Sequence, residues 1–350
     1  MLALLGACAL GSTFDPASVA PGFKGWGYVS IRDTLAASIN TPVMVVNGAS
    51  TGPTFTVTVT YPTEYCGVEA AGRLYQLMEP SELTGKLIIL PAVNMQVLQH
   101  RTPMFGLTGS VTPSDGKMLA ASFPGDENGT VTDTLADFVF RRFIGASSFH
   151  VDLRGGDLPE SHLTHTIFLQ GMGDAIDATS RAMGTVFGTK FCRQSGPTVF
   201  DTKPGSLIYE AIASGVPSII SEAGRGFDPQ PTEEDTQSHV TGVLNLLRWA
   251  KMMPGLPVPP AEPQAYLAAE LVSVRAPVDG IFKRRPDRGE LVTKGETIGV
   301  IADLDSSVLA EVRAPCDAVV HEMLPRRVVT RGDTVYHLAV VTGPVSAGES

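Results

Sequence analysis

Between residues 42 and 252, short apolar runs alternate with segments of helical periodicity, and this alternation limits the chain to few folds. The runs at 42–47 and 86–90 are almost wholly apolar and stop at glycine or proline, as strands buried on both faces do. Apolar residues recur at helical spacing at 69–78 and 240–252. We therefore expect an α/β protein with a mixed, largely parallel sheet and flanking helices. Further strands are expected at 54–61, 147–153 and 217–221, and further helices at 131–144 and 206–213.

A proline-rich stretch at residues 254–263, PGLPVPPAEP, ends this region. Its five prolines favour a stiff, extended linker, and the sequence that follows is β-rich. The expected organisation is an N-terminal segment at 1–40, an α/β domain at 41–253, the linker at 254–263, a β-barrel-like domain at 264–343 and a tail at 344–350.

The segment after the linker contains an internal repeat. VRAPVDG at 274–280 matches VRAPCDA at 312–318, and LVTKGETI at 291–298 matches VVTRGDTV at 328–335, at offsets of 38 and 37 residues. Two matching halves predict a small, pseudo-symmetric β-sandwich or barrel, and the pattern resembles the biotinyl/lipoyl-like fold. A carrier domain of that kind needs a lysine at the hairpin tip between the halves. The tip at 302–307, ADLDSS, has none, so a structural or lid role is expected.

Composition argues against several classes of partner. The 350 residues include 26 lysines and arginines against 36 aspartates and glutamates, with no basic run, so no nucleic acid partner is expected. No apolar run approaches the ~20 residues of a membrane-spanning helix, so no membrane partner is expected either. The four cysteines form no CxxC pair, which indicates reduced thiols. We expect a cytoplasmic protein and leave a homo-oligomer open.

A series of motifs stands in fixed order along the α/β region. They are VNGASTGP at 46–53, EYCGVEA at 64–70, LPAVN at 90–94, RTP at 101–103, PSDGK at 113–117, FPG at 123–125, DLRGGDLPE at 152–160 and SEAG at 221–224. These motifs resemble those of the succinylglutamate desuccinylase/aspartoacylase family in the zinc carboxypeptidase superfamily. The resemblance implies a carboxypeptidase-like fold and the hydrolysis of an N-acyl amino acid.

The resemblance also implies a zinc ion held by two histidines and a glutamate, which polarises the amide carbonyl and activates water. This chain departs from that pattern. The HxxE motif is replaced by YPTE, so that Tyr61 stands for a histidine while Glu64 is kept. In the DLH motif the histidine is replaced by Arg154, a permanent cation that cannot ligate a metal. We therefore expect the family zinc to be lost and no cofactor to take its place.

The altered positions suggest a different catalytic set. Arg154 is expected to pair with Glu64, a cation in the place of the zinc, or to bind an anionic oxygen of the substrate together with Arg101. Tyr61 and Glu222 are the candidates for proton transfer. Positive charge nearby is expected to lower the pKa of Tyr61. The pocket is thus expected to be locally basic and to suit a small anionic substrate.

Further residues are expected to support the site. Asp152 and Glu160 are candidates for substrate binding. Glu160 and Asp157 are candidates for orienting Arg154 or for capping the glycine turn. Arg225 and Arg193 are candidates for lining the entrance of the pocket.

A metal ion could also have moved elsewhere. His162 and His165 are three residues apart and could share one face of a helix, so with Asp152 they could form a relocated metal site. Ordinary core or surface histidines are the simpler interpretation.

Three functions stay open at this point. The first is a zinc-independent enzyme, a lyase, isomerase or hydrolase, that acts on a small carboxylate or an N-acyl amino acid. The second is a catalytically inactive pseudoenzyme that binds a metabolite or a partner. The third is a zinc-dependent N-acyl amino acid amidohydrolase with relocated ligands.

Overall fold

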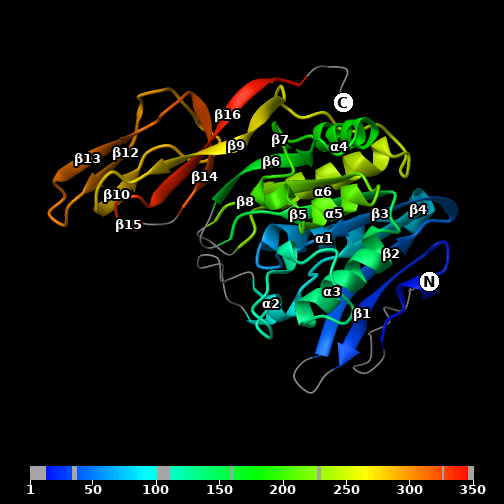
Figure 1. Cartoon of the computed structure of the whole chain (residues 1–350). Helices are drawn as coiled ribbons and strands as arrows, with labels where there is room; N and C mark the ends of the chain where they lie inside the picture. Colours follow the sequence, from blue (N-terminus) through cyan, green and yellow to red (C-terminus); the bar gives the residue numbers. More distant parts are fainter. Residues whose placement is uncertain are drawn as a thin grey trace.

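The computed structural model describes residues 13–33, 38–100, 111–157, 161–226, 230–324 and 327–345. Within these ranges, a twelve-stranded mixed sheet runs through the molecule in the order β1-β2-β4-β3-β5-β8-β6-β7-β9-β16-β14-β11 (Figure 1). Strands β4, β3, β5 and β8 are parallel to one another, and so are β6, β7 and β9. The first eight strands are β1 (Phe23–Asp33), β2 (Ser38–Asn47), β3 (Ser50–Thr58), β4 (Thr84–Leu90), β5 (Phe149–Arg154), β6 (Ser161–Leu169), β7 (Phe191–Ser195) and β8 (Ser218–Gly224).

The α/β class expected from the alternation is confirmed, with some differences in the elements. The edge strand β1 lies in the segment for which no element was expected. Gly25 and Gly27 interrupt its apolar pattern, and Trp26 is exposed. The expected strand at 54–61 begins earlier, at Ser50, and ends at Thr58, which leaves Tyr61 in the turn that follows.

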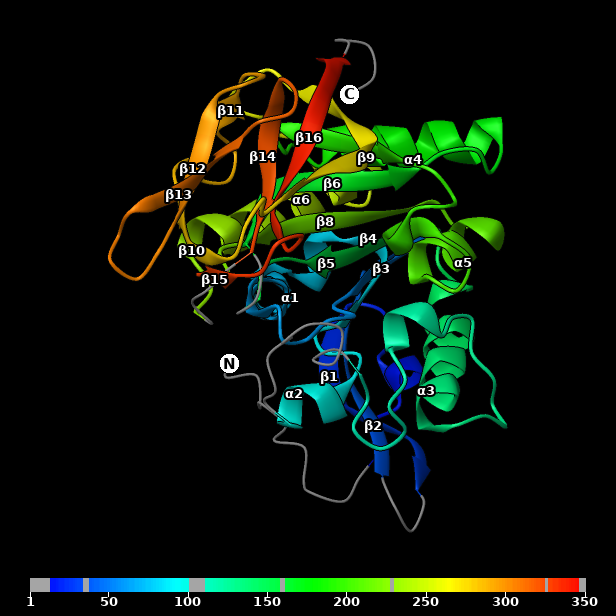
Figure 2. The same ribbon diagram turned by 60° about the vertical axis from the view of Figure 1, so that its left-hand side comes forward.

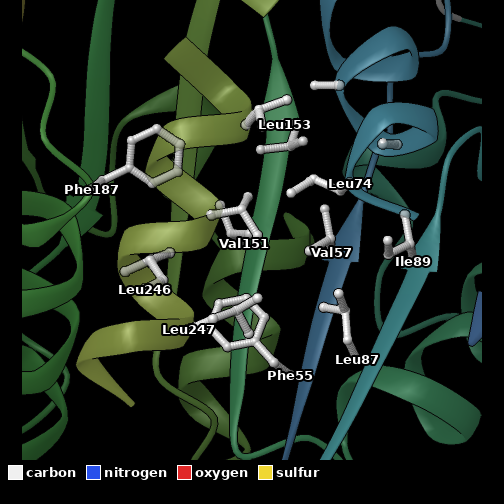
Figure 3. Close-up of a cluster of buried hydrophobic side chains, with 14 of the residues drawn as sticks. Phe55, Val57, Leu74, Leu87, Ile89, Val151, Leu153, Phe187, Leu246 and Leu247 are labelled. Atoms are coloured by element: carbon white, nitrogen blue, oxygen red, sulfur yellow. The ribbon is translucent and has the colours of Figure 1, made fainter. Parts of the chain in front are cut away.

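Helices cover both faces of the sheet (Figures 1 and 2). One face packs against α1 (Tyr65–Leu77), α4 (Asp174–Val186) and α6 (Glu233–Trp249). Figure 3 shows how Leu74 of α1 and Leu246 of α6 meet Val57 and Val151 of the sheet, all of them fully buried. Each such side chain contributes ~1.5–3 kcal/mol by leaving water. The other face packs against α3 (Val131–Val139) and α5 (Leu207–Ala213), and α2 (Met95–His100) lies next to β2.

The C-terminal residues form two facing layers of strands, which we call the C-terminal module. One layer is the end of the large sheet, with β9 (Ala265–Arg275), β16 (Thr334–Pro344), β14 (Ala318–Met323) and β11 (Leu291–Val292). The other is a four-stranded sheet of β13 (Val308–Arg313), β12 (Thr297–Ala302), β10 (Gly280–Arg284) and β15 (Val328–Val329). The sequence repeat places β10, β11 and β12 in correspondence with β14, β15 and β16, so one layer maps onto the other in strand order. This confirms the pseudo-symmetric sandwich, while the biotinyl/lipoyl-like assignment stays a prediction.

The module is continuous with the core. β9 pairs in parallel with β7, and β14 pairs with β6 so that Glu322 lies opposite His162. The guanidinium of Arg288 donates to both carboxylate oxygens of Asp235 at 3.0 Å, and this pair is almost fully buried. The module is therefore clamped against the core and can supply one wall of a site. No helix among the described residues is long and apolar enough to cross a membrane.

Candidate active site

A cavity of about 610 Å³ lies where the module meets the ends of the core strands. Tyr61, Glu64, Arg154 and Glu222, the four residues expected to be catalytic, all line it. Arg154 is the last residue of β5, and Glu222 lies beside it in register on the parallel strand β8. Tyr61 and Glu64 come from the turn between β3 and α1, where Glu64 precedes the first turn of the helix. Segments separated by more than 150 residues thus converge on one cavity.

The environment of Arg154 is strongly anionic. Its side chain is 3% exposed, its Nε atom lies 2.6 Å from a carboxylate oxygen of Asp152, and its Nη1 atom lies 3.3 Å from one of Asp201. Burial opposes the charge, but Asp152 and the other nearby anions outweigh it and hold the pKa of Arg154 above its usual value. Arg154 is therefore a permanent cation. The carboxylate of Glu64 accepts a hydrogen bond from the backbone N–H of Gly155 at 2.7 Å.

Asp152 acts on the site through Arg154. It is fully buried, it is absent from the described lining of the cavity, and it also accepts hydrogen bonds from the hydroxyls of Thr58 and Thr60. These contacts make Asp152 the residue that orients Arg154, a role that the sequence did not indicate, and they do not support the expectation that Asp152 binds substrate directly. The alternation along β5 explains the arrangement, since residues 152 and 154 share one face of the strand.

The expected pKa of Tyr61 was wrong in direction. Its ring stacks under the guanidinium of Arg154, 4.9 Å from ring centroid to Cζ. Burial raises the pKa of Tyr61 far more than the positive charge of Arg154 lowers it, and Asp201 raises it further. The phenol therefore stays protonated at neutral pH and cannot serve as a base. Its packing against the guanidinium is a cation–π contact that fixes the plane of Arg154.

The structure places the remaining candidate site residues differently from one another. Arg101 and Glu160 lie outside the described residues. Arg225 is exposed and is absent from the described lining of the cavity, and its backbone N–H donates to the carboxylate of Asp235. Arg193 does line the cavity, from β7, and it is nearly as buried as Arg154. Asp201 was missed, because it lies in a 3₁₀ helix of three residues, which is too short to show a periodic pattern in the sequence.

Histidines form another wall of the same cavity. His162 and His165 come from strand β6, which corrects the expectation of a shared helix face. His321 and Glu322 come from β14, and His337 from β16. The Nε2 atoms of His165 and His321 lie 3.1 Å apart, and the Nδ1 atom of His165 lies 2.8 Å from the carbonyl oxygen of Leu163.

Burial lowers the pKa of both His165 and His321 and so keeps these two rings neutral. It lowers the pKa of His165 to about 3, helped by the positive charge of Arg193. One difference between the two halves of the sequence repeat could have indicated His321 and Glu322 as candidate site residues. In the first half of the repeat, the matching positions are Lys283 and Arg284, so the two halves differ there in chemistry.

The zinc position that the motif resemblance implies holds residues that do not fit a metal ion. Of its three ligands only Glu64 is present, and the permanent charge of Arg154 stands in the place of a histidine. A relocated site that includes Asp152 is not supported either, because its carboxylate is already bound by Arg154 and two threonines.

The cavity is also more acidic than expected. The described lining contains five carboxylates and two guanidiniums, which corrects the expectation of a basic pocket. The carboxylates belong to Glu64, Asp201, Glu222, Glu270 and Glu322, and the guanidiniums to Arg154 and Arg193.

No protein-family model matches this chain. Among curated proteins, the N-alpha-acetyl-L-2,4-diaminobutyric acid deacetylase of Halomonas elongata is 26% identical over 329 residues, which cover 91% of this chain and 88% of that protein. Among solved structures, a succinylglutamate desuccinylase/aspartoacylase from Rhodobacter sphaeroides is similar with a TM-score of 0.78 and 25% identity, covering 91% of this chain and 96% of the other.

The product-bound ectoine utilization protein EutE (DoeB) from Ruegeria pomeroyi has the same fold, with a TM-score of 0.76 and 23% identity over 91% of this chain and 95% of the other. The sequence motifs, the fold and these neighbours agree with one another. Together, the curated and structural neighbours point to the succinylglutamate desuccinylase/aspartoacylase family for this chain.

Proposed function

We propose that this protein is a hydrolase that removes the acyl group from an N-acyl amino acid. The observation that carries the proposal is that Arg154 and Glu222 are neighbours in strand register on β5 and β8 and both line one cavity. A fixed cation beside a carboxylate offers an electrophile and a base, the two groups that amide hydrolysis needs. The deacetylase activity named for the Halomonas relative supports the reaction class.

In the proposed reaction, Glu222 takes a proton from water as the water oxygen attacks the amide carbonyl. Arg154 stabilises the negative charge that develops on the carbonyl oxygen. Its Nε and Nη1 atoms lie against aspartates, so we assign Nη2 as the donor to the carbonyl oxygen. The proton on Glu222 then passes to the leaving nitrogen, and a carboxylate and an amine are released. No metal ion takes part between Glu64 and Arg154.

The acidic lining narrows the proposed substrate class. N-alpha-acetyl-L-2,4-diaminobutyric acid, the substrate named for the Halomonas relative, has a free side-chain amine in addition to its carboxylate. Five carboxylates against two guanidiniums favour a substrate of this kind, with a second, cationic amine. Arg193 is the candidate partner for the substrate carboxylate, because it is buried in the wall and carries a permanent charge.

The test is a turnover screen of N-acetyl and N-succinyl amino acids, with and without a side-chain amine. We expect hydrolysis, fastest for substrates that carry the amine. Glu222→Gln should lower kcat by about 10²- to 10⁴-fold, the usual contribution of a general base. Glu82→Gln, a change on the exposed surface, is the matched control and should retain activity. Hydrolysis of none of these amides, or full activity in Glu222→Gln, would overturn the proposal.

A further inference from the structure

The histidine-rich wall of the cavity contains three side chains whose donor atoms could bind one metal ion. One ring nitrogen of His162, one of His321 and a carboxylate oxygen of Glu322 all lie within 4.8 Å of one another. They come from β6 and β14, at the point where the module pairs with the core sheet. Two imidazoles and one carboxylate are the protein ligands of many catalytic zinc sites, which keep a fourth position open.

The backbone is irregular where these donors converge. On a regular strand, His321 and Glu322 would point to opposite faces. The pairing of β14 with β16 shifts between Val320 and Glu322, so His321 is an extra residue in the ladder and both side chains reach the cavity. A second shift, between His162 and His165 in the pairing of β6 with β8, has the same effect on the facing strand.

Hydrogen bonds fix the protonation of His321. The carbonyl of Leu163 can only accept, so the Nδ1 atom of His165 carries the proton and its Nε2 atom carries a lone pair. That lone pair accepts from the Nε2–H of His321. The Nδ1 atom of His321 is then a bare lone pair, and it is buried without a hydrogen-bond partner among the described residues. Histidine ligands commonly donate their other N–H in this way, to a group that orients the ring.

A buried acceptor without a partner is destabilising, and a bound cation would remove that cost. The charge of the cavity favours a cation as well, because its described lining contains five carboxylates and two guanidiniums. Of the two guanidiniums, Arg154 is neutralised by Asp152 and Asp201, and Arg193 also lies 4.0 Å from Asp201.

We propose that His162, His321 and Glu322 bind a divalent metal ion of the zinc class, with the coordination completed by water or by a substrate oxygen. His165 is a positioning residue that orients His321. The site uses a strand of the C-terminal module and differs from the family zinc position, which this chain has lost. The proposal stands independently of the deacylase function, since it concerns the binding of the metal itself.

The test uses the full-length protein after metal removal with a chelator, titrated with Zn²⁺ in a calorimeter and with Co²⁺ as a visible-absorption probe. We expect one Zn²⁺ per chain and the spectrum of four- or five-coordinate Co²⁺. Glu322→Gln, nearly isosteric, should weaken binding by at least 100-fold, and so should His321→Ala. His165→Phe should weaken it by roughly 10- to 100-fold, as the loss of an orienting partner does. Glu82→Gln, on the exposed surface and outside the described lining of the cavity, is the matched control and should change affinity less than threefold.

Absence of stoichiometric binding by the wild type would overturn the proposal, and so would equal binding by Glu322→Gln and wild type. Loss of the metal in Glu64→Gln but not in Glu322→Gln would place it at the family position and would also overturn it. Should His321→Ala fail to fold, as judged by circular dichroism, Glu322→Gln decides. Glu222→Gln should still bind one Zn²⁺, so a failed deacylase assay and a failed metal site give different results.

Discussion

At the scale of single residues, the site depends on how one buried cation is held. Arg154 is surrounded by two aspartates and a tyrosine ring, and the side chain of Asp152 is in turn held by threonines. The motif resemblance led to Arg154 and Glu222 from the sequence, and both line the cavity, while their catalytic roles stay a proposal. It could not give the direction of the pKa shift at Tyr61, because the cost of desolvation depends on burial that only the folded chain defines.

The buried ion pair between Arg154 and Asp152 leads to a prediction about the free energy of unfolding. Arg154→Met leaves a buried carboxylate without its counter-charge and should lower the free energy of unfolding by ~3–5 kcal/mol. Asp152→Asn in the same chain removes that unpaired charge, so the double variant should regain most of the loss. Urea denaturation of both single variants and the double variant measures the coupling. Simple addition of the two single effects would contradict a direct interaction.

At the scale of elements, the neighbouring strands β6 and β14 supply the histidine-rich wall of the cavity. The internal repeat was readable from the sequence and gave the pseudo-symmetric layers correctly. The convergence of His321 with His162 was not readable, because it depends on shifts in strand register and on the pairing of β14 with β6. Such pairings join positions about 160 residues apart, and no periodicity within a strand indicates them. Arg288 holds this junction through Asp235 at the start of α6.

Arg288→Met should therefore destabilise the protein by ~3–5 kcal/mol, because it leaves the buried carboxylate of Asp235 without its counter-charge. Hydrogen exchange should rise first in β14 and β6, the strands that meet at this junction. Arg313→Met is the matched control, since Arg313 pairs with Glu311 on the exposed surface, and it should cost less than ~1 kcal/mol. Equal losses of unfolding free energy in the two variants, measured by urea denaturation, would show that burial does not make the Arg288–Asp235 pair more stabilising than an exposed pair.

At the scale of the whole molecule, the cavity has walls from both halves of the chain. The α/β core contributes the arginines and Glu222, and the module contributes His321 and Glu322. The sequence predicted the core and the module as separate domains joined by a linker, but the large sheet runs from one into the other. The linker is itself fastened, since Asn245 of α6 exchanges two hydrogen bonds with the backbone of Val258. Ordering of the core and completion of the cavity are therefore expected to be a single cooperative event.

Buried histidines in the core make stability depend on pH. Burial lowers the pKa of both His150 and His239 to about 4 from an ordinary value of 6.5. Both rings lie in fixed hydrogen bonds, His150 with Thr58 and Ser218, and His239 with the carbonyl of Arg154. Between pH 6.5 and 4, the unfolded chain binds protons that the folded chain does not, so stability falls as the pH falls.

Each of these two histidines should lower the free energy of unfolding by about 1.5 kcal/mol between pH 6.5 and 5, and by little between pH 8 and 7. The buried His165 and His321, whose pKa values are also lowered, add to the total. Urea denaturation across this range measures the slope. His239→Asn keeps a polar side chain that does not titrate, so it should remove about 1.5 kcal/mol of the fall between pH 6.5 and 5 while lowering stability at pH 8. A slope that is unchanged in His239→Asn would mean that this ring is protonated in the folded protein, and the described burial would then fail to explain the acid sensitivity of the core.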